Sequence, residues 1–122
     1  MLQGLRTVIY PVSDAAKAKK FYNALTGAEP YFDQPFYIGY NVGGYELGLD
    51  PNPKKQASGP MEGPLTYWGV ANIEEAYANI LAIGARPHLP IQDVGEGIKV
   101  ASVLDPFGNA VGLIENPGFK AQ

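Results

Sequence analysis

The chain has 122 residues, of which 46% are hydrophobic and 17% are charged. These values indicate one folded domain of ordinary size and exclude an intrinsically disordered chain. Because the sequence contains no cysteine, disulfides, thiolate metal sites and cysteine nucleophiles are excluded as well.

The net charge of −3 comes from 9 basic and 12 acidic residues. The basic cluster Lys17, Lys19 and Lys20 offers too small a positive surface to favour nucleic acid as a partner. No apolar run approaches the ~18 residues that a membrane span needs, and residues 1–6 lack the pattern of a secretory signal. We therefore expect a cytoplasmic protein with no nucleic-acid or membrane partner.

A strand, a helix and three further strands are predicted in the first half of the chain. Residues 5–12 are rich in β-branched and aromatic side chains, which is typical of a strand. Apolar residues at helical spacing follow, with Ser13 or Asp14 as the N-cap and Gly27 at the end of the helix. Strands are then expected at 29–32, 36–40 and 45–49, and Gly43 and Gly44 predict a hairpin turn before the last of them.

The same pattern begins again after a stretch rich in proline and glycine, residues 51–64, which we interpret as a surface linker. A strand is expected at 65–70, and Asn72 with Glu75 forms a capping box that starts a second helix, which ends at Gly84. Three more strands are expected at 86–92, 98–104 and 110–115.

The two halves align with each other at a nearly constant offset. Residues 12–14 match residues 70–72, and residues 26–30 match residues 83–87. The sequence therefore predicts an α+β fold of two βαβββ units in one domain, with the first unit at about 1–50, the linker at 51–64 and the second unit at about 65–122.

The helix start at residues 12–14, its continuation to Gly27 and the closing run 105–115 resemble the vicinal oxygen chelate superfamily. This superfamily contains glyoxalase I, extradiol dioxygenases, and bleomycin and fosfomycin resistance proteins. The resemblance implies a curled mixed sheet that forms a cup around a ligand, helices on its outer face, and pairing into a homodimer. It also implies that four strand positions, which hold the metal in the family's metal enzymes, fall here on Thr7, Glu46, Leu65 and Gly112.

Only Glu46 among these four residues is a good ligand for a divalent metal ion, because leucine and glycine have no donor side chain and a threonine hydroxyl is a weak one. The single histidine, His88, lies outside the family pattern. We therefore expect no metal site and no cofactor, and we interpret His88 as a solvated residue at a strand edge.

Strand alternation places Ile9 with Thr7, Gly48 with Glu46, and Tyr67 with Leu65 on the inward faces, while Trp68 packs toward the helices. The aromatic residues between 31 and 40 are candidates for the pocket lining or, alternatively, for a dimer interface. The predicted ligand-binding residues are Thr7, Ile9, Phe32, Phe36, Tyr37, Tyr40, Glu46, Tyr67 and Gly112.

The leading functional hypothesis is a metal-independent small-molecule-binding protein that is similar to the bleomycin-resistance members and takes a partly aromatic ligand. In this hypothesis Glu46 orients the ligand. The alternative is a metal-free isomerase or epimerase with Glu46 as the catalytic base. A purely structural Glu46, paired with lysine or arginine or reaching solvent, is a further alternative, and a metal-dependent glyoxalase, lyase or dioxygenase is the least favoured function.

Overall fold

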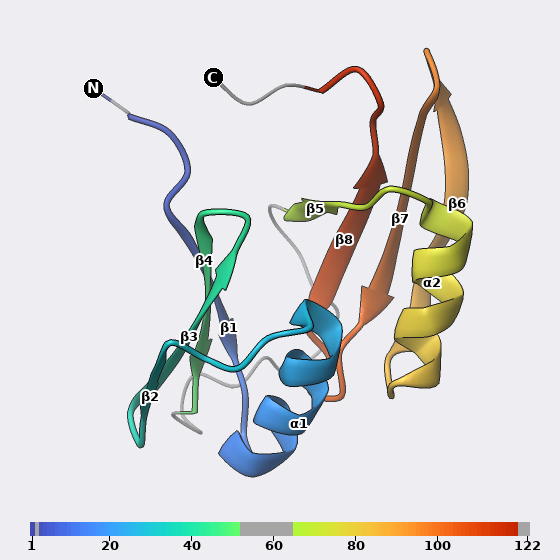
Figure 1. Ribbon diagram of the computed structural model, residues 1–122. Coiled ribbons are helices and arrows are strands. Elements are labelled where there is room, and N and C mark those ends of the chain that lie inside the picture. The colour runs from blue at the N-terminus through green and yellow to red at the C-terminus, as the bar shows by residue number, and fades with distance from the viewer. Residues whose placement is uncertain (2, 52–64, 120–122) are drawn as a thin grey trace. The chain divides into compact units, whose positions relative to one another are not determined.

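The computed structural model describes residues 1, 3–51 and 65–119, and the chain divides into two compact units, Met1–Gly59 and Pro60–Gln122 (Figure 1). Over the described residues, each unit contains one strand, one helix and three further strands in that order. The predicted α+β fold with two βαβββ units is therefore confirmed. The predicted linker, 51–64, lies outside the described residues except for Pro51.

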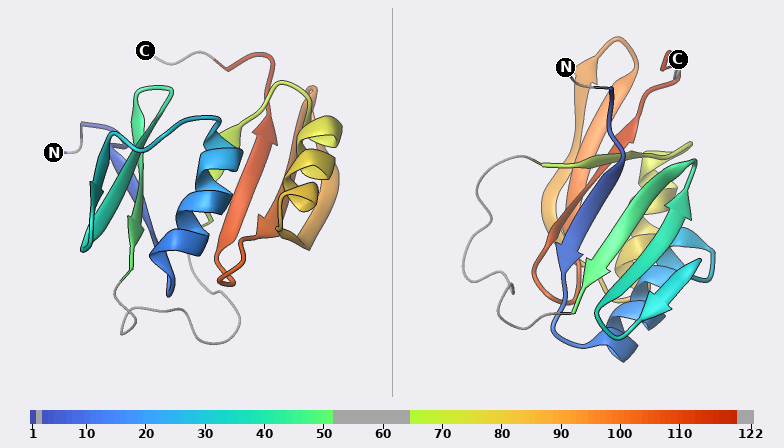
Figure 2. Two further views of the ribbon diagram at one scale, coloured as in Figure 1. Left: turned by 60° about the horizontal axis from the view of Figure 1, so that its bottom comes forward. Right: turned by 90° about the vertical axis from the view of Figure 1, so that its left-hand side faces the viewer.

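The first unit is built on a four-stranded mixed sheet. Its strands lie in the order β1-β4-β3-β2, with β1 parallel to β4 and the other neighbours antiparallel, as the right-hand view of Figure 2 shows. The predicted hairpin between β3 and β4 is confirmed, since Gly43 and Gly44 have φ values of 60° and 91°. The strands are β1 (Thr7–Pro11), β2 (Phe32–Gln34), β3 (Tyr37–Val42) and β4 (Tyr45–Asp50).

The helix α1 (Ala15–Thr26) covers one face of this sheet. The Asp14 side chain caps its start by accepting the Lys17 N–H, and Gly27 ends it in the left-handed conformation at φ 70°. The buried Tyr22 ring lies 5.9 Å from the Tyr10 ring of β1 and 6.5 Å from the Tyr40 ring of β3. The core of the first unit therefore lies on the face that carries Tyr10 and Tyr40.

The second unit repeats this plan in the sheet order β5-β8-β7-β6, with β5 parallel to β8. Figure 1 shows α2 lying along β6 and β7. Asn72 caps the helix by accepting the Glu75 N–H at 3.0 Å, and the Ile73 N–H donates to the Glu115 carboxylate of β8 at 2.8 Å. The elements are β5 (Tyr67–Gly69), α2 (Ile73–Ala82), β6 (Arg86–Gly95), β7 (Ile98–Leu104) and β8 (Ala110–Glu115).

The strand β6 is longer than predicted and irregular. Its pairing with β7 shifts register between Pro87 and Leu89, and twice more before Gly95. Such shifts are bulges, in which an extra residue on one strand bends it away from a regular ladder. His88 lies in the first of them, exposed as expected, with its Nδ1 atom 2.8 Å from the Ser102 hydroxyl.

The turn before β8 is held by a buried carboxylate. Asp105 is fully buried and accepts the N–H groups of Phe107 and Asn109, each at 2.8 Å. Gly108 adopts φ 88°, the positive value expected for this turn. Among the described residues, no helix has both the length and the apolar character that crossing a membrane requires.

Candidate functional site

Glu46 of β4 is held by three hydroxyl groups on the sheet face opposite α1. Thr7 stands directly across from it on the parallel strand β1, so both side chains point to the same side. The Thr7 and Tyr37 hydroxyls each donate to Glu46 Oε1 at 2.8 Å. The Tyr31 hydroxyl donates to Glu46 Oε2. We call Thr7, Tyr31, Tyr37 and Glu46 the Glu46 cluster.

Two glycines make room for this cluster. Gly39 of β3 and Gly48 of β4 pair across the sheet on the same face as Glu46. A Cβ atom on Gly48 would lie 2.6 Å from Cζ of Tyr37, closer than real Cβ atoms approach a neighbour. A Cβ atom on Gly39 would lie 3.1 Å from Glu46 Oε2 and 3.3 Å from the Tyr31 ring. The bare backbone of the two strands therefore forms the floor beneath both tyrosines.

Further aromatic side chains flank the cluster. The Phe32 ring lies 6.2 Å from the Tyr37 ring and meets Phe36 edge-on at 6.0 Å. Tyr31 and Phe36 are 63% and 70% exposed, which is unusual for large aromatic residues. Ile9 of β1 is also exposed, and it lies opposite Gly48 on the same face. The first unit therefore presents a carboxylate within an accessible apolar and aromatic surface.

The hydrogen bonds set the protonation of the cluster. The hydroxyls of Tyr31 and Tyr37 lower the pKa of the Glu46 carboxyl, and Thr7 adds to this effect against a small opposing effect of desolvation. The bond to Glu46 raises the pKa of Tyr31, while burial and then the bond to Glu46 raise the pKa of Tyr37 against an opposing effect of the Thr7 hydroxyl. At neutral pH Glu46 is therefore an anion and both tyrosines keep their protons.

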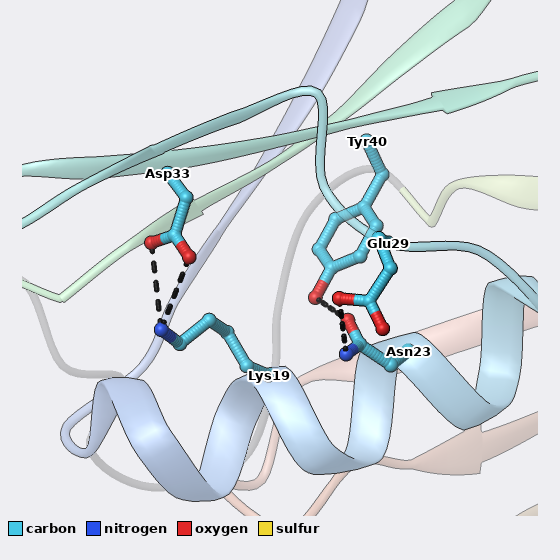
Figure 3. Close-up of polar contacts among 5 residues, drawn as sticks. All are labelled: Lys19, Asn23, Glu29, Asp33 and Tyr40. Atoms are coloured by element: carbon cyan, nitrogen blue, oxygen red, sulfur yellow. Dashed lines mark hydrogen bonds and ion pairs between the residues drawn. The ribbon is translucent and has the colours of Figure 1, made fainter.

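Tyr40 is the predicted site residue of the first unit that lies away from this group. It is fully buried on the α1 face, and its hydroxyl donates to Asn23 Oδ1 at 2.7 Å (Figure 3). Burial raises the pKa of Tyr40 to about 12. Tyr37 and Tyr40 are three positions apart in one strand, and an odd spacing sends two side chains to opposite faces. Tyr40 therefore belongs to the helix packing, beside the ion pair between Lys19 and Asp33 that Figure 3 also shows.

Tyr31 is the member of the cluster that the predicted site did not include. The strand that was expected at 29–32 begins only at Phe32, and Tyr31 precedes it with its N–H donating to the Gly39 carbonyl at 2.9 Å. The excess of aromatic residues between 31 and 40 was the available sequence signal, but it did not indicate which hydroxyl reaches Glu46.

The predicted site residues of the second unit lie on β5 and β8. Tyr67 pairs with Gly112, so both belong to one face, and Trp68 pairs with the buried Leu113 on the other. A Cβ atom on Gly112 would lie 2.5 Å from the Thr66 carbonyl oxygen and 2.8 Å from the Tyr67 ring. Leu65 precedes β5. Over the described ranges, no three acidic or histidine side chains gather in a way that could hold a metal ion.

A sequence profile of the glyoxalase/bleomycin resistance protein/dioxygenase superfamily matches residues 4–113. The chain belongs to this superfamily. The match runs through both βαβββ units and confirms the resemblance seen in the helix starts and the closing run of the sequence. A search of curated proteins gave no significant match.

Solved structures of superfamily members share the fold of this chain. A glyoxalase-related enzyme from Fulvimarina pelagi is 20% identical, with a TM-score of 0.79 over 99% of this chain and 94% of its own. A fosfomycin resistance protein from Listeria monocytogenes is 15% identical, with a TM-score of 0.78 over 97% of each chain. A glyoxalase/bleomycin resistance protein from Albidiferax ferrireducens is 23% identical, with a TM-score of 0.71 over 92% of this chain and 98% of its own. At these identities the likeness concerns the superfamily fold alone.

Proposed function

We propose that this superfamily member is a metal-independent small-molecule-binding protein whose ligand is oriented by Glu46. The observation that carries the proposal is the Glu46 carboxylate, anchored by the hydroxyls of Thr7, Tyr31 and Tyr37 among exposed aromatic rings. Apolar surface with a few fixed polar groups is typical of small-molecule sites. Gly39 and Gly48 support the same function, because their lack of side chains lets Tyr31 and Tyr37 lie against the strands and reach the carboxylate.

The protonation of Glu46 favours binding over catalysis by a general base. A carboxylate that removes a proton near neutral pH works best when its pKa is raised toward the working pH. The hydroxyls around Glu46 act in the opposite direction and lower its pKa. This favours an ionic hydrogen-bond acceptor over the base of a metal-free isomerase or epimerase.

The donors at the four metal positions of the family support metal independence. Only Glu46 among Thr7, Glu46, Leu65 and Gly112 brings a carboxylate, and both of its oxygens already accept hydroxyl protons. A catalytic zinc site usually needs about three strong protein ligands. These residues do not fit a divalent transition metal, so no catalytic step is assigned to one.

Thermal unfolding tests this proposal. The protein is melted with Ni²⁺, Zn²⁺ or Fe²⁺, with a chelator, and with a panel of partly aromatic compounds. A ligand present at 100 times its Kd adds about 2.7 kcal/mol to the stability of the folded state. We expect a higher Tm with some aromatic compounds and no change with metals or chelator. A Tm that rises with a metal, falls with the chelator and loses both responses in Glu46→Gln would refute metal independence.

We propose further that the protein works in the cytoplasm as a homodimer. The support for pairing is that β1 and β2 are the outer strands of the first unit's sheet, and outer strands carry backbone groups that a second chain can cover. Light scattering coupled to gel filtration measures the mass in solution, and a monomer across the working concentration range would contradict pairing.

A further inference from the structure

The orientation of the hydroxyl groups determines what the Glu46 cluster can offer a ligand. Each of the three hydroxyls has a single proton, and the hydrogen bonds direct all three protons to the Glu46 carboxylate. Another molecule can therefore interact with these hydroxyls by donating a hydrogen bond to an oxygen lone pair. The cluster is thus a set of hydrogen-bond acceptors.

The carboxylate itself has one acceptor position left. An ionised carboxylate has about four lone-pair sites, two on each oxygen. Oε1 accepts from Thr7 and Tyr37, whereas Oε2 accepts from Tyr31 alone. By this count Oε2 keeps one acceptor position for a ligand donor beside the Tyr31 hydroxyl.

In the part of the chain that the structure describes, the groups bonded to the Glu46 carboxylate are uncharged hydroxyls. Within residues 3–51 and 65–119, the ion pairs are Lys19 with Asp33 and Lys99 with Glu74, and neither of them involves Glu46. The aromatic rings beside the cluster attract cations through their electron-rich faces.

We propose that the Glu46 cluster binds an organic cation carrying several N–H donors, such as the ammonium group of an arylalkyl primary amine. The N–H groups donate to Oε2 of Glu46 and to the hydroxyl oxygens of Tyr31 and Tyr37, while the aryl body packs on Phe32 and Phe36. This inference rests on the proposed small-molecule-binding function and names the chemical class of its ligand.

The same geometry ranks competing ligands. A quaternary ammonium has the charge but no N–H donor, so it keeps only the attraction to the carboxylate and the rings. An alcohol supplies one donor and no charge. A carboxylate ligand has the same charge as Glu46, and it has no proton to donate to the acceptor atoms of the cluster. The expected order of affinity is therefore primary amine, quaternary ammonium, alcohol, carboxylate.

Four related probes test the ranking: phenethylamine, its trimethylated quaternary analogue, phenethyl alcohol and hydrocinnamate. Each is titrated into the full chain at neutral pH while amide chemical shifts are followed by NMR. Ligands of so few atoms bind weakly, with a Kd of about a millimolar. We expect phenethylamine to bind most tightly and to shift the amides of Gly39, Glu46 and Gly48.

Two variants and a matched control locate the interaction. Glu46→Gln removes the charge and should weaken phenethylamine about tenfold, since hydrogen bonds to charged groups are the stronger ones. Tyr31→Phe keeps the ring and exchanges the hydroxyl acceptor for a second free position on Oε2, so the amine should keep its advantage over the quaternary analogue. Tyr45→Phe is the control, because Tyr45 lies on the same strand at a position that faces away from Glu46 and should leave every Kd unchanged.

The outcomes separate the two proposals. If the alcohol or the quaternary analogue binds these residues as tightly as the amine, the ligand class proposed here is wrong and the small-molecule-binding function stands. If Glu46→Gln leaves the Kd of the amine unchanged, the ligand class is also wrong. If no probe and no compound of the wider thermal panel binds, the small-molecule-binding function itself is refuted together with the ligand class.

Discussion

Gly48→Ala tests whether the glycine floor positions Tyr37. The added Cβ atom would lie 2.6 Å from Cζ and 2.9 Å from Cε1 of the Tyr37 ring. Overpacking of this kind usually costs about 1–3 kcal/mol. Replacing glycine also lowers the conformational entropy of the unfolded chain, which stabilises the folded state by about 0.4–1 kcal/mol. The difference spans about 0–2.6 kcal/mol, and we expect a loss near its middle, about 1 kcal/mol in the free energy of unfolding.

Urea unfolding followed by far-ultraviolet circular dichroism measures this loss. In a chain of this size, each kcal/mol corresponds to about 3–5 °C in Tm, so thermal melts provide a second readout. Gly69→Ala is a matched control, because Gly69 is also a strand glycine without a positive φ and a Cβ atom there would meet nothing within 4 Å. Gly39→Ala should lie between the two, since its nearest neighbours would be 3.1–3.3 Å away.

A double-mutant cycle assigns the cost to the ring of Tyr37. In a Tyr37→Ala background the obstacle is absent, so Gly48→Ala should cost about 1 kcal/mol less than in the wild type. The reasoning is refuted if Gly48→Ala is as harmless as Gly69→Ala, or if its cost is the same with and without the tyrosine ring.

Three further predictions concern pH and packing. Because the folded-state pKa of Glu46 is lowered, its contribution to stability is present above the unfolded pKa and is lost as pH falls through the folded value. Urea melts at a series of acidic pH values should therefore show a shallower loss for Glu46→Gln than for the wild type; parallel curves would contradict this. Tyr40 has a pKa raised to about 12, so its contribution is present below the ordinary value and is lost as pH rises toward the folded one. Tyr40→Phe should remove the last step of the tyrosinate absorbance titration and lower the free energy of unfolding by about 1 kcal/mol at neutral pH. An unchanged titration would refute the assignment of the raised pKa to Tyr40. Gly112→Ala should cost about 2 kcal/mol or more, because its Cβ would meet the rigid Thr66 carbonyl oxygen at 2.5 Å; a variant as stable as the wild type would show that β5 and β8 can separate freely.

Local rules were sufficient to predict most of the fold. Capping chemistry predicted Ser13 or Asp14 at the start of α1, where the structure has Asp14, and it predicted Gly27 at the end of α1 and Asn72 at the start of α2. The resemblance to the superfamily placed Thr7 and Glu46 together on the inward face, and their pairing between β1 and β4 puts both side chains on one face. The length of β6 was underestimated, since its bulges interrupt the alternation from which strands are recognised.

The candidate site was only partly predictable, because it depends on contacts between distant residues. The alternation rule separates Tyr37 from Tyr40, and applying it to both tyrosines would have assigned Tyr40 to the helix face. The position of Tyr31 has no such local cause. It depends on where β2 begins and on the absence of a side chain at Gly39, a residue of the neighbouring strand. The ligand function of the predicted residues remains a prediction for the experiments above.

The irregularity of β6 bears on how the protein avoids aggregation. An outer strand of ten residues could serve as a template on which other chains add strands and grow into fibrils. Pro87 and Pro90 have no N–H to offer such a chain, and the register shifts break up any flat row of hydrogen-bonding groups. The bends that made this strand hard to recognise thus protect the folded protein against self-templating.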